Sequence, residues 1–162
     1  MSQNLKMQFG EDNSILRKKS EYITNINKEI RDIVKYMDGE LKLQDGMGIA
    51  APQVGINIRL AIITQRDIIK WKYIYKSSKT IVNPIVTKHS ETTNDDREWC
   101  LSLPGNVWLI ARYDRVEISY QDIYSKTKTA KLKSIDARIA QHEIDHLDGI
   151  LYMDRAKTIK PA

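Results

Sequence analysis

Two of the three histidines in this chain stand in one short stretch near its carboxyl end, Gln141-His142-Glu143-Ile144-Asp145-His146. On an α-helix His142 and His146 are one turn apart, roughly 6 Å along the axis, and share a face. Two imidazoles on one face can hold one metal ion. Glu143, beside them, can act on a water bound to that ion, as in metal-assisted hydrolysis. The stretch therefore predicts a metal-binding helix.

The residues around this stretch support a buried helix. Its opposite side carries an apolar set: Ala140, Ile144 and Leu147. Ser134 or Asp136 is expected to cap the start of the helix, and Gly149 to end it. A helix rich in His, Glu and Asp can also be a solvated face, but a buried apolar side favours the metal site.

A catalytic metal site normally takes three protein ligands and leaves one position for water. The sixteen residues after His146 contain no His, Glu or Cys, so the third ligand is expected upstream. The residues alone leave His89, Cys100 and a carboxylate open. Cys100, the only cysteine, also fits the description of a small buried hydrophobe.

Three segments, in this order, resemble the motifs GxGxAAPQ, EGCLS and QHExDHLxG of the peptide deformylases. They are residues 46–53, residues 98–102 and residues 141–149. Residues 15–19 are also similar to the amino-terminal lead-in of that family, so the resemblance covers residues 14 to 154. It implies that Cys100, as a thiolate, joins His142 and His146 as the third metal ligand.

The resemblance also implies roles around the metal. Glu143 would take a proton from the attacking water and pass it to the departing amine. The side-chain amide of Gln53 and the backbone N–H of Leu101 would stabilise the oxyanion. Arg138 or Asp145 would either orient the site or form a surface ion pair.

The expected substrate-binding residues lie in the first two motifs: Gly46, Gly48, Ile49 and Trp99. Trp99 departs from the family pattern, which has a small residue there, so we expect activity with altered substrate selectivity. Ile139 and residues near Leu109 are further candidates for the lining of the pocket.

The implied reaction removes the formyl group from N-formylmethionyl nascent peptides and releases formate. The implied cofactor is one divalent metal ion, Fe²⁺ in vivo, with Zn²⁺, Ni²⁺ or Co²⁺ as alternatives. Two other functions stay open: a metallopeptidase of the HExxH type, and a non-catalytic relative that only binds peptides.

With 41% hydrophobic and 29% charged residues, the chain is expected to form one globular domain, residues 1–162, with residues 1–13 as a flexible lead. It lacks an apolar run of ~20 residues and a signal or transit pattern. A single cysteine suits a reducing compartment, so we expect a cytoplasmic location. The net charge of +5 is scattered, which predicts no specific nucleic-acid recognition. We expect a monomer, and the resemblance adds transient association with the ribosome.

The coarse pattern predicts an α+β fold, with mostly antiparallel strands around the carboxyl-terminal metal helix and a long amino-terminal helix. That first helix is expected over residues 21–41, where apolar residues recur every three or four positions. Residues 46–55 and 90–97 are expected as loops, and Asn83-Pro84 as a bulge or edge. The expected strands cover residues 58–64, 72–75, 80–88, 107–111, 116–121 and 129–134.

Overall fold

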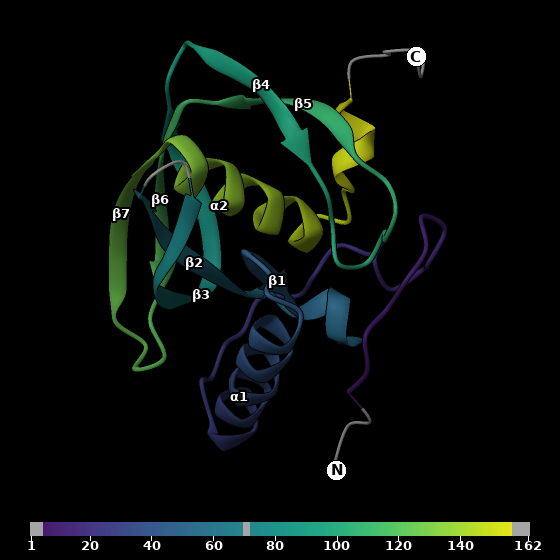
Figure 1. Cartoon of the computed structure of the whole chain (residues 1–162). Helices are drawn as coiled ribbons and strands as arrows, with labels where there is room; N and C mark the ends of the chain where they lie inside the picture. Colours follow the sequence, from purple (N-terminus) through teal and green to yellow (C-terminus); the bar gives the residue numbers. More distant parts are fainter. Residues whose placement is uncertain (1–4, 70–71, 157–162) are drawn as a thin grey trace.

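A five-stranded antiparallel sheet lies at the centre of the computed structural model, which describes residues 5–69 and 72–156 (Figure 1). Its strands follow the order β1-β2-β3-β6-β7, and each neighbouring pair is antiparallel. Their bounds are β1 (Gly48–Ala50), β2 (Leu60–Ile69), β3 (Lys72–His89), β6 (Arg115–Gln121) and β7 (Thr127–Lys133).

Two helices cover opposite faces of this sheet, α1 (Lys28–Leu43) and α2 (Ser134–Leu147). The alternation of β2 shows this directly. Ala61 and Ile63 belong to the hydrophobic cluster that contains the apolar side of α2, whereas Leu60 and Ile62 belong to the cluster that contains α1. Successive residues of a strand point to opposite faces, so the sheet separates the two helices.

A smaller sheet pairs β4 (Thr93–Glu98) with β5 (Trp108–Tyr113). A third hydrophobic cluster joins Cys100, Leu103 and Ile110 to Leu16, Leu151 and Tyr152. Two short 3₁₀ helices complete the structure: η1 (Ala51–Val54) after β1, and η2 (Tyr152–Arg155) after α2. The predicted α+β class is confirmed.

Several predicted element boundaries are wrong. Residues 46–55 are predicted to form a loop, but Gly48–Ala50 form β1 and Ala51–Val54 form η1. Residues 90–97 were expected as a loop, but most of them form β4. Five of the six β4 residues are exposed, so the strand forms by backbone pairing with β5 and carries no apolar alternation. The strands expected over 72–75 and 80–88 run together as β3. The irregularity expected at Asn83-Pro84 is confirmed, because the register shifts between Val82 and Ile85 and Asn83 has φ of 52°.

The first helix begins at Lys28 rather than at residue 21. The Asn27 side chain caps it by accepting from the Ile30 backbone N–H. The residues before it bond to other parts of the chain: the Glu21 N–H donates to the Asn57 carbonyl, and the Ile23 N–H to the Asn83 side chain. These distant partners, which no local pattern reveals, hold the segment extended.

The predicted end of α2 is confirmed, but the predicted capping of its start is wrong. Neither Ser134 nor Asp136 caps the start, because the N-cap residue is Lys133 and no side-chain bond is made there. Gly149 follows the last turn with φ of +74°, as expected. A Cβ on Gly149 would lie 2.4 Å from the Arg17 carbonyl oxygen, so a larger residue does not fit.

The amino-terminal lead, expected as flexible, makes backbone contacts from residue 6 onward. The N–H groups of Lys6 and Gln8 donate to the carbonyls of Val54 and Gln53, and the Gly10 N–H donates to Ser102. Residues 1–4 lie outside the described residues. Within the described part of the chain, no helix is long and apolar enough to cross a membrane.

Candidate metal centre

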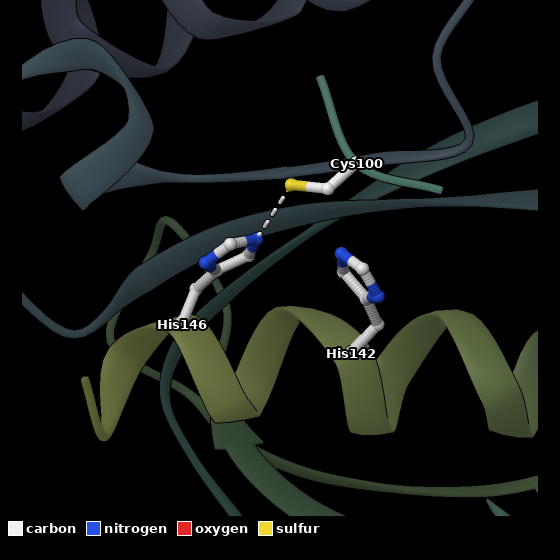
Figure 2. Close-up of side chains that lie close together, drawn as sticks. All are labelled: Cys100, His142 and His146. Carbon is white, nitrogen blue, oxygen red and sulfur yellow. Dashed lines mark hydrogen bonds between the residues drawn. The ribbon is translucent and has the colours of Figure 1, made fainter. Parts of the chain in front are cut away.

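His142 and His146 project from the same side of α2 toward Cys100, which lies just after β4 (Figure 2). One potential ligand atom from each of the three residues lies within 4.8 Å of the other two. The Cys100 Sγ is 3.2 Å from the His146 Nε2. The shared face predicted from the spacing of the two histidines is confirmed, and the structure brings Cys100 to it.

The alternation around Cys100 explains how the sulfur reaches the centre. Glu98 and Cys100 are both buried, whereas Trp99 between them is 55% exposed. The sulfur also accepts hydrogen bonds from the Ser102 backbone N–H at 3.4 Å and from the Gln53 Nε2 at 3.5 Å. Cys100 is therefore held in place before any ion binds.

The donor set and its orientation fit one divalent transition metal ion. The His142 Nδ1 bonds to the Glu98 Oε2 at 2.9 Å, which leaves its Nε2 as the ligand atom. The His146 Nε2 already faces the Cys100 sulfur. A thiolate with two imidazoles suits such ions and leaves a fourth position for water. His89, an alternative ligand on sequence grounds, is exposed and stacks on Tyr113 instead.

The ligands stabilise one another electrostatically. Burial alone would raise the pKa of the Cys100 thiol, but the charges of His146 and His142 and their hydrogen bonds lower it well below its ordinary value. Burial alone would lower the pKa of His142, and its bonds to Cys100 and Glu98 raise it well above the usual range. The cysteine is thus available as a thiolate, the form that binds metals. An arriving ion would displace the proton on the imidazole.

Glu143 stands beside these ligands with its carboxylate buried. Burial raises its pKa to about 7, against the opposing charges of His142 and His146. Its Oε2 has no hydrogen-bond partner among the described residues. A Cβ on Gly48 would lie 2.4 Å from the Glu143 Oε1, so the glycine makes room for the carboxylate. A carboxylate that titrates near neutral pH can both accept and return a proton.

A buried ionic network surrounds Glu98, the hydrogen-bond partner of His142. Glu98, bonded to His142, also accepts from Arg112 Nε and Nη2 at 2.9 and 3.0 Å and from Arg138 Nη1 at 2.7 Å. Burial would raise the pKa of Glu98, but the bonds from His142 and Arg112 lower it below its usual range. Glu98 is therefore an ionised acceptor that fixes the orientation of the His142 ring.

The network continues to Asp145, which accepts from Arg112 and from two nitrogens of Arg155. Arg138 and Asp145 are each 5% exposed, so neither forms a surface ion pair. The motifs do not indicate Arg112 or Arg155. One signal for Arg112 was present, because Trp108, Ile110 and Arg112 alternate along β5 and an arginine at an inward position needs a buried partner.

Gln53 and Leu101 lie at the same centre. The Gln53 Oε1 accepts from the Ala50 backbone N–H at 2.8 Å, which turns the amide nitrogen toward Cys100 and toward the Ser102 hydroxyl at 3.2 Å. Leu101 follows Cys100 and lines the same cleft. No described residue accepts a hydrogen bond from the Leu101 backbone N–H.

A cleft of about 200 Å³ opens onto the centre, lined by Gly46, Gly48, Trp99 and Ile139 together with the metal-site residues. The side chains of two candidate residues lie away from this cleft. Ile49 is fully buried against α1, because the alternation of β1 turns it away from Gly48 and Ala50. Leu109 does not line the cleft and is 39% exposed outside it.

Comparisons with known proteins give a consistent result. The family model for polypeptide deformylase matches residues 7–162. A peptide deformylase of Picosynechococcus sp. is 36% identical over 143 residues, which cover 88% of this chain and 74% of the relative. The peptide deformylase from Synechococcus elongatus, solved in complex with actinonin, has a TM-score of 0.84 and 30% identity over 98% of this chain and 82% of that one. The enzyme from Acinetobacter baumannii, solved with Met-Ala-Ser bound, has a TM-score of 0.86 and 26% identity over 96% and 99%.

Proposed function

This chain belongs to the polypeptide deformylase family, and from that premise we propose that Cys100, His142, His146 and Glu143 perform its reaction. The enzyme is a metal-dependent hydrolase that removes the formyl group from the amino-terminal formylmethionine of newly made polypeptides and releases formate. The observation that carries the residue assignment is the convergence of one sulfur and two imidazoles beside a buried carboxylate.

Cys100, His142 and His146 would hold one divalent ion. Such an ion supplies Lewis acidity, which lowers the pKa of a water ligand toward neutrality and polarises a carbonyl group. We propose Fe²⁺ as the ion in vivo, with Zn²⁺, Ni²⁺ or Co²⁺ as substitutes, because first-row ions of this kind accept mixed thiolate and imidazole ligands. Metal analysis after purification without oxygen tests this, and zinc alone at full occupancy would contradict the iron assignment.

Glu143 acts as general base and then as general acid. Its carboxylate accepts a proton from the attacking water as the carbon–oxygen bond forms at the formyl carbon. It then donates that proton to the methionine nitrogen as the carbon–nitrogen bond breaks, so formate and a free amino terminus leave. Burial disfavours the charged form of this carboxylate, which favours its acceptance of the proton from water.

The negative charge that develops on the formyl oxygen is stabilised by the Gln53 amide and the Leu101 backbone N–H. The bond from Ala50 to the Gln53 Oε1 holds the amide in a fixed orientation, so little reorganisation is needed during the reaction. Gln53 also donates without adding a net charge beside the metal ligands.

We propose that the peptide binds along the cleft, in contact with the lining residues Gly46, Gly48 and Trp99, and that the buried Ile49 contributes only its backbone. The Acinetobacter baumannii relative was solved with Met-Ala-Ser bound, the product expected from formyl-Met-Ala-Ser. We propose that the same product occupies this cleft.

The experiment pairs formate release from formyl-Met-Ala-Ser with metal analysis. Glu143→Gln should lower kcat by about 10²- to 10⁴-fold while one ion stays bound, since the ligands are untouched. Cys100→Ala should lose the ion. The exposed Glu91→Gln is the matched control and should behave as the wild-type enzyme.

Two results would contradict this division of roles. A Cys100→Ala variant that keeps its metal and cleaves unformylated peptides would indicate a metallopeptidase with another ligand. A wild-type protein that binds both metal and peptide but releases no formate would indicate a binding protein.

We propose further that the enzyme is a monomer, works in the cytoplasm and associates transiently with ribosomes. A reducing compartment would keep the buried Cys100 free for the metal. Sedimentation of the protein alone and with ribosomes tests two of these points. A stable dimer would contradict the first, and the absence of any salt-sensitive co-sedimentation would contradict the last.

A further inference from the structure

Three apolar side chains are exposed where the end of β4 meets the start of β5: Trp99, which lines the cleft, at 55%, and Val107 and Leu109, which lie outside its lining, at 58% and 39%. Glu98 pairs with Trp108 and Arg97 with Leu109, so Trp99 and Val107 directly flank a paired position. We call this set the apolar shelf.

Trp99 cannot turn inward to hide its ring. Its two neighbours, Glu98 and Cys100, are anchored on the buried side, by the arginines and by the metal-site contacts respectively. Successive residues of an extended chain point to opposite sides, so the indole is held outward. An apolar cluster that the backbone keeps in solvent is typical of a binding surface.

The apolar shelf lies where a substrate peptide bound in the cleft would leave it. Trp99 both lines the cleft and belongs to the shelf, so the two surfaces are continuous. A substrate whose formyl group reaches Cys100 and the histidines must leave the cleft past its lining. An extended peptide advances roughly 3.4 Å per residue, so the first or second residue after methionine lies about 3 to 7 Å farther along the chain.

We propose that the apolar shelf binds an apolar side chain one or two residues after formylmethionine, and so makes the enzyme selective for nascent chains with an apolar residue there. This inference rests on the proposed function and specifies its substrate class. The contact is made equally in substrate and transition state, so it should act through KM and leave kcat nearly constant.

The test compares kcat/KM for formyl-Met-Ala-Ser, formyl-Met-Leu-Ser and formyl-Met-Ala-Leu. We expect kcat/KM of the wild-type enzyme to be about tenfold higher for the better of the two leucine peptides than for formyl-Met-Ala-Ser. This is the effect of burying one side chain against an apolar surface. In Trp99→Gly the preference should fall to about twofold or less. Leu109→Ser should give an intermediate value.

Tyr124→Ser is the control, because Tyr124 is 75% exposed on the turn between β6 and β7, outside the cleft lining. It should keep the tenfold preference. Calorimetric titration of the wild-type enzyme and the three variants with the product Met-Ala-Leu should rank their affinities in the same order, without any turnover.

The inference is overturned if the wild-type enzyme shows no preference among the three peptides, or if Trp99→Gly retains it. It is also overturned if the shelf variants change only the sedimentation of the protein, which would make the shelf a contact between copies of this chain. Absence of formate from all three peptides would instead refute the function on which the inference rests.

Discussion

Replacing Gly48 by alanine should disable the general base without touching a metal ligand. Gly48 lies in β1, and its position would place a Cβ 2.4 Å from the Glu143 Oε1 and 2.7 Å from its Cδ and Cγ. Contacts of this kind are normally about 3.4 Å or longer, so the carboxylate must move by about 1 Å. A misplacement of that size can cost about 10²-fold in rate, equivalent to about 3 kcal/mol of activation free energy.

The assay is formate release from formyl-Met-Ala-Ser, with metal content and unfolding measured on the same preparations. We expect Gly48→Ala to lower kcat by about 100-fold and to keep one ion per chain. Gly46→Ala should be milder, because the added Cβ meets the flexible ends of Leu41 and Leu101.

Gly39→Ala, in the middle of α1, is the matched control because nothing lies within 4 Å of its added Cβ. It should keep full activity and stabilise the helix by about 1 kcal/mol. Activity of Gly48→Ala within threefold of wild type would refute the argument from the tight contact. Loss of the metal ion instead of the rate would also refute it.

Three further predictions concern charge and the metal. Arg112→Lys keeps the charge but cannot donate to Glu98 and Asp145 together. We therefore expect metal affinity, measured in competition with a chromogenic chelator, to fall by about 10- to 100-fold. Unchanged affinity would show that the network does not position His142. In the metal-free protein, burial raises the pKa of Glu143 from 4.5 to about 7, so the folded state binds the extra proton and stability should fall as pH rises through that range. The free energy of unfolding of Glu143→Gln, measured relative to wild type by urea denaturation, should therefore rise by about 3 kcal/mol from pH 4.5 to pH 8. The same free-energy difference between variant and wild type at both pH values would contradict the pKa shift. The iron-loaded enzyme should lose activity in air while the nickel-loaded enzyme keeps it, because a thiolate-bound ferrous ion is readily oxidised; equal decay of the two forms would exclude that cause.

The structure departs from the sequence-based expectations mainly where a segment's partners are distant. The strand β4 is polar along most of its length, and only its pairing with β5 makes it a strand. The segment before α1 has helical spacing of apolar residues, yet its backbone bonds to Asn57 and Asn83 keep it extended. Local patterns describe which face is apolar, but they do not report which distant donors and acceptors satisfy the backbone.

The amino-acid sequence by itself determined the features that depend on short spacing. His142 and His146 share a face because a helix repeats every 3.6 residues, and Gly149 ends that helix because it accepts a positive φ. The order of three motifs indicated the family. Alternating apolar residues indicated an α+β fold.

Only the tertiary structure decided which distant residues meet. It brought Cys100 to the histidines and left His89 on the surface, a choice that the residues alone had kept open. It also joined Glu98 to Arg112 behind His142 and set Gly48 against Glu143. The physical reason is that such contacts depend on how the sheet and α2 pack. A shift of a few ångströms at that interface decides whether a side chain can bind the metal or is only buried near it.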